Sequence, residues 1–406
     1  MVSSEYPPKW GGVGVVAYYL STWMAKRGHE VHVVTRDQKM GHMKSHENIT
    51  IHPVKWLKAP MLFTLSFGDH AVKWIRDSGI DFDLVHVHSN MALLRKKHYF
   101  SSRVPIVSTM HGTWKGERST INWRNLTLSL SAINDLSVMY LSPLFDRFED
   151  HAIRFSNGVI TISYSECEAL KKRGIKNIYG RRIHLQNGID VEEFHPRNYD
   201  PGLKERYSIP EENRIISSVG RLAARKGVRE LLEAFRLMYG RRKDLTLILV
   251  GWGPLENEVR KKISRWGLDD NVILVKSPPH DEMKAIVATA DIAMFHSYWE
   301  GYGLTFGEAL ASETPCVLTD VGGASEMVVE GTGKLVEVGD IKGQADAALD
   351  LLSVDNPEDW GKRGREHIKR YCSWDGIAEK TEKFYKWVVE DPENKEGWRE
   401  DFERCP

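Results

Sequence analysis

Two series of short apolar runs, each run followed by a segment with helical periodicity, constrain this fold more than any other feature of the sequence. The first series has runs near 2–4, 30–35, 49–54, 84–88, 105–110 and 158–163, and the second has runs near 215–219, 246–251, 272–276, 291–296, 315–319 and 334–338. Strands that alternate with helices form parallel sheets with helices on both faces. The sequence therefore predicts an α/β protein with two doubly wound domains.

The change from the first series to the second lies near residue 190. We expect an N-terminal domain over 1–188 and a second domain over 189–373. The segment 195–202, with two prolines and a glycine, is the best candidate for a linker. The last helical stretch, 374–390, follows the final strand and has no strand of its own to cover, so we expect 374–406 to pack back on the first domain.

Charge and cysteine content exclude several classes of protein. The 56 basic residues offset the 56 acidic ones, so no overall field favours nucleic acid or an anionic membrane. The four cysteines are far apart and form no C-x-x-C pair, which argues against a zinc site or a disulfide framework. No run approaches the ~20 apolar residues of a membrane span, and the first residues lack a signal peptide. We expect a cytoplasmic protein, with membrane contact at most peripheral.

A glycine-rich turn, Gly11 to Gly14, stands between the first predicted strand and a helix that ends at Gly28. Exposed N–H groups at such a helix start favour phosphate. With Ala17, the pattern Gly12-x-Gly14-x-x-Ala17 also fits the dinucleotide fingerprint, although Glu5 to Trp10 separate it from the strand. A flexible strand-to-helix turn is the structural alternative.

A basic loop, 220–227, occupies the corresponding place after strand 215–219. Arg221 and Lys226 are the two cations that could neutralise a diphosphate there. As an alternative, both are solvated loop charges.

The segment 297–309 again follows a strand and carries two glutamates within a turn rich in glycine and aromatic residues. Glu308 has a structural explanation, because Thr305-x-x-Glu308 reads as a capping box. Glu300 has none, and a carboxylate among glycines at the mouth of a sheet is typical of sugar-hydroxyl recognition.

Three histidines and two aspartates lie at or beside predicted strands of the first series. His111 ends a strand just before Gly112, so a functional role and a purely structural role of its side chain are about equally expected. His86 and His88, within a strand, fit the structural reading. Asp81-x-Asp83 precedes its strand and so lies at the amino edge, where we do not expect a metal site.

Three basic segments are weaker indications of function, because each has an ordinary structural explanation. The stretch 55–63 mixes lysine with aromatic and aliphatic residues, which suits either a peripheral membrane contact or, more often, a helix that covers the sheet. Lys171 to Arg173 and Arg181-Arg182 are expected to be a solvated helix end and a solvated loop.

Taken in order, these motifs resemble the family 4 retaining glycosyltransferases of the GT-B fold. The matching segments are 3–14, Asp83 to His88, Asn187 to Asp190, Val219 to Leu222, Lys226-Gly227, Val250 to Pro254, Glu300 with Glu308, and Val321 to Gly323. They extend over nearly the whole chain. Family members usually carry several apolar residues before the equivalent of Val2, so we expect a short first strand here.

The resemblance implies two Rossmann-like domains that face each other across a cleft, and transfer of a sugar from a nucleotide-sugar to an acceptor hydroxyl with retention of configuration. No cofactor or metal is implied. The donor would be a UDP-, GDP- or ADP-sugar and the acceptor a sugar or a lipid-linked molecule, with no nucleic acid partner. The long segment 113–157 varies most in the family and is expected to shape the acceptor pocket.

The roles implied for individual residues follow the family. The resemblance assigns the diphosphate to Arg221 and Lys226, the ribose to Glu308 and the base to the backbone near Ser277. It assigns the transferred sugar to Glu300 with the backbone of Gly301, Tyr302, Gly303 and Leu304. From the first domain, Gly12 would approach the phosphates and His111 the sugar. Catalysis would rest on Glu300, His111, Arg221 and Lys226. Two alternatives stay open: an NAD-dependent oxidoreductase built on Gly12, and a non-catalytic nucleotide-sugar-binding protein.

Overall fold

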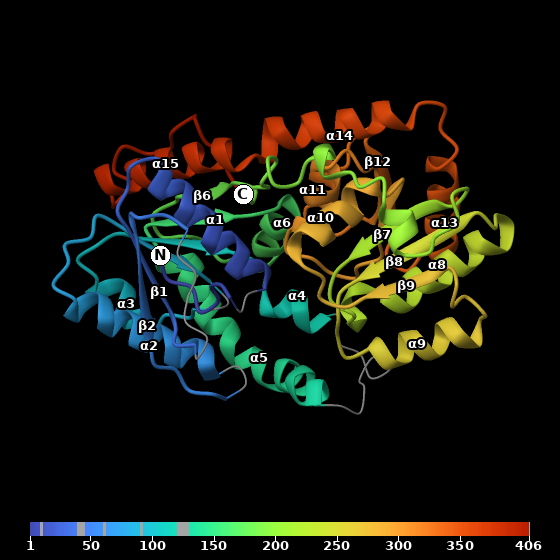
Figure 1. Cartoon of the computed structure of the whole chain (residues 1–406). Coiled ribbons are helices and arrows are strands. Elements are labelled where there is room, and N and C mark those ends of the chain that lie inside the picture. Colours follow the sequence, from blue (N-terminus) through green and yellow to red (C-terminus); the bar gives the residue numbers. More distant parts are fainter. Residues whose placement is uncertain (9–10, 39–44, 60–61, 90–91, 120–129, 406) are drawn as a thin grey trace. The chain divides into compact units, whose positions relative to one another are not determined.

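The computed structural model describes residues 1–8, 11–38, 45–59, 62–89, 92–119 and 130–405, and it divides into two compact units (Figure 1). Unit 1 holds Met1–Ser119, Ile133–Gly188 and Trp374–Pro406, and unit 2 is built on Ile189–Ser373. The predicted linker 195–202 lies inside unit 2, where Pro196–Asn198 forms a short 3-10 helix, η1, that packs on α10 (His280–Thr289). The linker prediction is therefore wrong.

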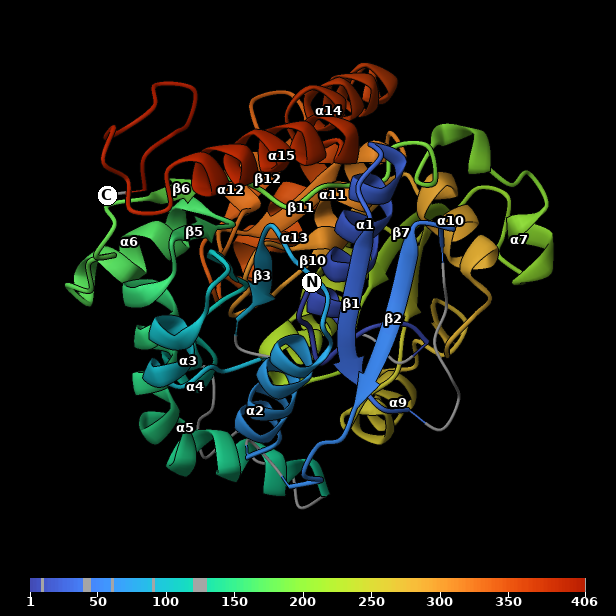
Figure 2. The same cartoon turned by 90° about the vertical axis from the view of Figure 1, so that its left-hand side faces the viewer.

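The described residues of unit 1 form six strands, all paired in parallel. They are β1 (Val31–Arg36), β2 (Ile49–Val54), β3 (Val85–His88), β4 (Ile106–Met110), β5 (Gly158–Thr161) and β6 (Arg182–His184). The order β3-β4-β5-β6 forms one sheet, and β1 and β2 form a separate pair (Figure 2). Strand β6 was expected to be a solvated loop at Arg181-Arg182, but Arg181 is fully buried, which corrects that prediction.

The predicted first strand is reduced to a single residue. Val2 forms parallel bridges to Val34 of β1 and to Val87 of β3, and so connects the two sheets of unit 1. Its N–H donates to the His86 carbonyl at 2.7 Å, and its own carbonyl accepts from the His88 N–H at 3.0 Å. Its neighbours extend the contact with β1, since the Met1 carbonyl accepts from the Val34 N–H at 2.9 Å and the Ser3 N–H donates to the Val34 carbonyl at 3.1 Å.

Seven helices in the described part of unit 1 surround these strands. They are α1 (Gly12–Lys26), α2 (Leu62–Asp77), α3 (Lys96–Ser101), α4 (Trp114–Ser119), α5 (Leu130–Phe155), α6 (Tyr164–Lys172) and α15 (Trp374–Glu390). Helix α15 packs on α1, and the Trp374 and Tyr19 rings stack at 5.8 Å. Residues 55–58 are not helical, so the expected covering helix begins only at Leu62; residues 60 and 61 lie outside the described part.

The C-terminal tail is fastened to unit 1 by two buried contacts. Cys405 is disulfide-bonded to Cys167 of α6, although 238 residues separate them in sequence. Arg181 donates to the Asp391 carbonyl and stacks on the Trp387 ring. The sequence argued against a disulfide framework, and this one disulfide corrects that expectation. Spacing along the chain does not reveal where a returning tail lies.

Unit 2 contains one six-stranded parallel sheet in the order β12-β11-β10-β7-β8-β9. Its strands are β7 (Arg214–Val219), β8 (Leu245–Val250), β9 (Val272–Val275), β10 (Ile292–Phe295), β11 (Cys316–Thr319) and β12 (Gly333–Val336). Strand β8 is buried at every residue, as a strand covered on both faces must be. The order reverses at β7 and β10, so the carboxyl ends of these strands form a switch point where ligands bind in open α/β sheets.

Helices cover both faces of this sheet and create two separate cores. One core joins the strands to α8 (Val228–Arg241), α9 (Glu256–Arg265) and α13 (Ile341–Leu351), and the other joins them to α7 (Leu203–Arg206) and α10. The remaining helices are α11 (Leu304–Ala311), α12 (Ala324–Met327), α14 (Pro357–Cys372) and the 3-10 helix η2 (Ala224–Lys226). This is a doubly wound α/β sheet, and the predicted fold class is confirmed. None of the helices described carries an apolar stretch long enough to cross a bilayer.

Candidate functional site

The predicted basic loop follows β7 at the switch point of unit 2. Ala224–Lys226 forms η2, and Gly227 then adopts a left-handed conformation with φ of 58°. A Cβ at Gly227 would lie 1.8 Å from the His296 carbonyl oxygen, so only glycine lets this loop pack against the segment after β10. The local sequence thus places Lys226 beside the residues that follow β10.

Lys226 and Glu300 form an ion pair between these two loops. The Nζ of Lys226 donates to Oε1 of Glu300, which also accepts from the Ser297 hydroxyl at 2.7 Å. Burial favours the neutral carboxyl, but the charges of Lys226 and Arg225 outweigh it and hold the pKa of Glu300 below its ordinary value. Glu300 is 8% exposed, so this is a buried carboxylate kept ionised by its partners.

Arg221 lies in the same loop but has a different environment. Its side chain is exposed, and its guanidinium lies 5.7 Å from the centre of the Trp252 ring. A small cavity of about 20 Å³ is lined by Gly220, Arg221, Lys226 and Ser297. An exposed arginine and a paired lysine around one hollow are suited to binding an anion.

The segment from Gly301 to Leu304 turns directly into α11. Gly303 has a φ of 95°, and a Cβ there would lie 2.4 Å from the Phe306 ring. The Tyr302 hydroxyl is buried and lies 3.2 Å from the Cys372 Sγ. Because the Tyr302 side chain is buried against Cys372, only the backbone of Tyr302 is available to contact a ligand.

Glu308 is not the capping residue that its spacing suggested. Helix α11 begins at Leu304 with Gly303 as N-cap and without a side-chain cap, so Thr305 already lies within the helix. Burial raises the pKa of Glu308 to about 7, while the charges of His280 and Lys226 act in the opposite direction. The capping-box interpretation is wrong, and Glu308 is left as a buried carboxyl beside charged residues.

A further group near Glu308 was missed in the sequence. His280, the first residue of α10, lies 2.8 Å from Glu193 through Nε2, and Lys284 lies 3.8 Å from the same carboxylate oxygen. Ser277 lies on the exposed turn before α10, with a φ of 47°. Nothing in the spacing of Glu193 and His280 indicates this pairing, because 87 residues separate them.

In unit 1, Gly12 is the first residue of α1 and is exposed. The preceding N–H, that of Gly11, donates to the Glu5 carboxylate at 3.0 Å. The helix start therefore binds an anionic group, here from the chain itself.

His111 follows β4 and is 9% exposed. Its Nε2 lies 2.9 Å from Nδ1 of His88, the last residue of β3. Burial lowers the pKa of His111 to about 3, so its ring is neutral at ordinary pH. The fold brings His111 together with His88 within unit 1, and brings Arg221, Lys226 and Glu300 together within unit 2.

Two buried glutamates behind the His111 loop were also missed. Glu149 of α5 accepts from the Trp114 N–H at 2.7 Å and from the Arg173 guanidinium at 2.9 Å. Burial raises the pKa of Glu149 to about 7 and that of Glu166 well above its ordinary value. Arg173, expected at a solvated helix end, is only 11% exposed, which corrects that prediction.

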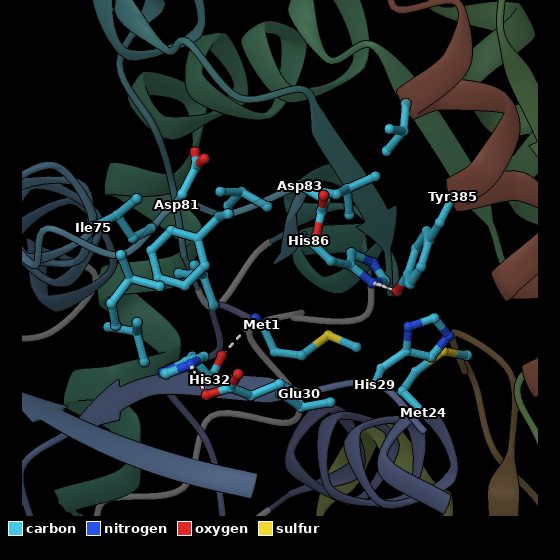
Figure 3. A pocket seen from close by; sticks show the side chains of 18 of the residues that line it. Met1, Met24, His29, Glu30, His32, Ile75, Asp81, Asp83, His86 and Tyr385 are labelled. Carbon is cyan, nitrogen blue, oxygen red and sulfur yellow. Dashed lines mark hydrogen bonds and ion pairs between the residues drawn. The ribbon is translucent and has the colours of Figure 1, made fainter. Parts of the chain in front are cut away.

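A cavity of unit 1 lies away from these residues. It measures about 420 Å³ at the amino ends of β1 and β3, and its lining includes Met1, Glu30, Asp81, Asp83 and Tyr385 (Figure 3). Asp81 and Asp83 thus lie at the amino edge, the position at which the sequence argued against a metal site. Because its lining contains none of the predicted site residues, this cavity is not the candidate site.

Two family models match consecutive parts of the chain. Residues 10–193 match the family described as Glycosyltransferase Family 4, and residues 201–367 match the family described as Glycosyl transferases group 1. The chain therefore belongs to the family 4, group 1 glycosyltransferases and is an enzyme that transfers a sugar. The nicotinamide-dependent alternative is not favoured.

Similar proteins agree with this assignment. The chain is 28% identical to the N-acetyl-alpha-D-glucosaminyl L-malate synthase of Bacillus anthracis over 95% of this chain and 97% of that protein. Its fold matches the sucrose-phosphate synthase of Thermosynechococcus elongatus with a TM-score of 0.73 and 21% identity, covering 96% of each chain. It also matches HepE of Anabaena, solved with UDP-glucose, with a TM-score of 0.70 and 17% identity over 95% and 99% of the two chains. The predicted GT-B fold is confirmed.

Proposed function

We propose that the chain transfers a sugar from a nucleoside-diphosphate donor to an acceptor hydroxyl with retention of configuration. The observation that carries this proposal is the Lys226–Glu300 ion pair with Arg221 beside it, at the carboxyl end of β7. Arg221 and Lys226 bind the diphosphate, Glu300 and the backbone from Gly301 to Leu304 bind the transferred sugar, and Glu308 binds the ribose. The backbone near Ser277 meets the base. From unit 1, Gly12 approaches the phosphates and His111 binds the transferred sugar.

The charges explain how such a site accelerates transfer. The departing nucleoside diphosphate gains negative charge, and preorganised cations stabilise that charge in the transition state. The ionised Glu300 keeps Lys226 in place before the donor arrives. We propose that these two cations suffice and that a chelator such as EDTA leaves turnover unchanged.

The relatives support the choice of substrates to test. HepE was solved with UDP-glucose, and the Bacillus anthracis enzyme is named for joining an N-acetylglucosaminyl group to L-malate. UDP-glucose and UDP-N-acetylglucosamine are therefore the first donors to test, followed by GDP- and ADP-sugars. The acceptor panel contains free sugars, lipid-linked sugars and small hydroxy acids.

The decisive experiment is a screen of these donors with anomer-resolved analysis of the product by NMR. Transfer with retained configuration supports the proposal. An inverted product, or turnover that EDTA abolishes, contradicts the mechanism. Donor binding in a thermal-shift assay without any turnover would instead support the non-catalytic alternative.

We also propose that the segment 55–63 makes a peripheral membrane contact. Leu57 and Leu62 are 53% and 46% exposed, and Lys55 and Lys58 beside them are exposed as well. Apolar and cationic side chains together favour an anionic bilayer surface. Flotation with vesicles that contain phosphatidylglycerol tests this contact, and a Leu57→Gln, Leu62→Gln variant should float less; equal flotation would contradict it.

A further inference from the structure

His88 and His111 meet edge to edge at the carboxyl ends of β3 and β4. Nδ1 of His88 lies 2.9 Å from Nε2 of His111. The ring centres are 5.1 Å apart and the ring planes lie within 18° of parallel. This geometry is that of one in-plane hydrogen bond between two ring nitrogens, so a single proton lies between them.

Both rings are neutral, so their protons are coupled. Burial lowers the pKa of His111 to about 3 and that of His88 well below its ordinary value. A neutral imidazole carries one N–H, and its other nitrogen is an acceptor. Whichever ring donates across the 2.9 Å contact therefore fixes the tautomer of both.

The second nitrogen of His88 decides the direction. Nε2 of His88 is buried and has no hydrogen-bond partner in the part of the chain that is described. A proton on Nε2 would be a buried donor without an acceptor, which native structures rarely contain. The proton of His88 therefore lies on Nδ1 and is donated to Nε2 of His111, which leaves the proton of His111 on Nδ1.

The orientation of His88 is itself fixed from behind. The His86 ring stacks on it with centres 4.6 Å apart, since residues two apart on β3 share a face. His86 is bonded to Thr109 Oγ1 at 2.7 Å and to the Tyr385 hydroxyl of α15, a contact drawn in Figure 3. Neighbouring strands and a helix thus hold His88 in the rotamer that meets His111.

We infer that His88 is a positioning residue for sugar transfer, because it fixes His111 as the tautomer that donates from Nδ1. His111 then offers a hydrogen-bond donor, and not an acceptor, to an oxygen of the transferred sugar. This inference rests on the proposed role of His111. His88 itself touches no substrate and acts only through His111.

Three variants test the inference by kinetics. His88→Leu removes the hydrogen-bond donor to His111. We expect kcat to fall about 10- to 100-fold, a loss of the size seen when a metal-ligating histidine loses its hydrogen-bond partner, while KM for the nucleotide-sugar changes little. His88→Asn keeps an N–H close to the position of Nδ1 and should restore most of kcat. His98→Leu is the matched control, because His98 is another buried histidine of unit 1, and it should keep wild-type kcat.

A spectroscopic measurement on the wild-type enzyme tests the tautomer directly. In ¹⁵N-histidine-labelled protein, the His111 signals, assigned through His111→Asn, should show a protonated Nδ1 and a bare Nε2. A proton on Nε2 of His111, or a His88→Leu enzyme as active as His98→Leu, would overturn the inference. If His111→Ala keeps wild-type turnover, the proposed role of His111 fails, whereas the spectrum still decides whether His88 sets its tautomer.

Discussion

Lys226 and Glu300 at the carboxyl edge of unit 2 form a charged pair, whereas His88 and His111 at the carboxyl edge of unit 1 are buried and neutral. In unit 2, Glu300 keeps its charge because Lys226 and Ser297 bind it. In unit 1, His88 and His111 have lowered pKa values because burial removes water and supplies no carboxylate partner among the described contacts. This difference fits the proposed roles, in which the unit 2 residues stabilise charge and His88 and His111 orient a hydrogen bond.

The charged edge should be the more sensitive one. In the proposed mechanism, Lys226→Ala removes a cation that stabilises the charge on the departing diphosphate. It also leaves Glu300 buried without its ion-pair partner. We expect kcat to fall about a hundredfold to a thousandfold, or ~3 to 4 kcal/mol of transition-state stabilisation. Steady-state kinetics with the best donor measure this effect. Lys261→Ala serves as the control, because Lys261 is exposed. Equal activity of the two variants would contradict a catalytic role of Lys226.

The next effect concerns the stability of unit 1. The Cys167–Cys405 disulfide holds the tail against α6, so Cys405→Ser should lower the free energy of unfolding by about 2 to 4 kcal/mol. Urea unfolding of the oxidised protein, with and without reductant, measures it. Reductant should destabilise the wild type and leave Cys405→Ser unchanged. A wild type that is insensitive to reductant would show that the tail needs no covalent link.

Glu308 and the paired Glu300 should affect the pH dependence of stability differently, because the pKa of Glu308 is raised and that of Glu300 is lowered. Burial raises the pKa of Glu308 to about 7 from an ordinary value of 4.5. The native state therefore holds this proton longer than the unfolded chain, and native stability falls as pH rises through this window. Glu308→Gln should be more stable than the wild type at pH 8 by up to ~3 kcal/mol, with little difference below pH 4.5. Urea unfolding at pH 4.5 and 8 tests this, and a pH-independent difference would contradict it.

The smallest expected effect is at Trp252. Its ring lies under the Arg221 guanidinium, and an exposed contact of this kind contributes about 0.5 to 1 kcal/mol. Trp252→Ala should therefore reduce kcat/KM for the donor about two- to fivefold. Arg221→Ala is the comparison, and once Arg221 is absent, removing Trp252 should have no additional effect. An additive loss in the double variant would mean that Trp252 contacts the donor itself.

The strands were the most predictable part of the fold. Eleven of the twelve labelled strands overlap apolar runs of the sequence, from β1 at 31–36 to β12 at 333–336. The exception, β6, carries Arg182 and His184 in a stretch with no apolar run. Its place is set by pairing with β5 and by the tail, where the Cys405 N–H donates to the Arg182 carbonyl. Such long-range pairing leaves no local signal.

In the candidate site too, the sequence indicated individual residues but not the residues that they contact. Glycine-rich and basic segments at strand ends indicated Arg221, Lys226, Glu300 and His111 as candidates. The partners of these residues were not visible, because Lys226 and Glu300 are 74 residues apart and His88 and His111 are 23 apart. The capping box at Glu308 failed for a related reason, since Gly303 and its left-handed backbone start α11 before Thr305.

By itself, the sequence determined the alternation of strands and helices, the fold class and the family, because periodicity and glycine-rich motifs are local properties of the chain. Only the tertiary structure decided which polar groups meet and which of them keep a charge. A pKa and a tautomer depend on burial and on partners that other strands and helices supply. For this protein, those partners are Glu300 for Lys226 and His88 for His111.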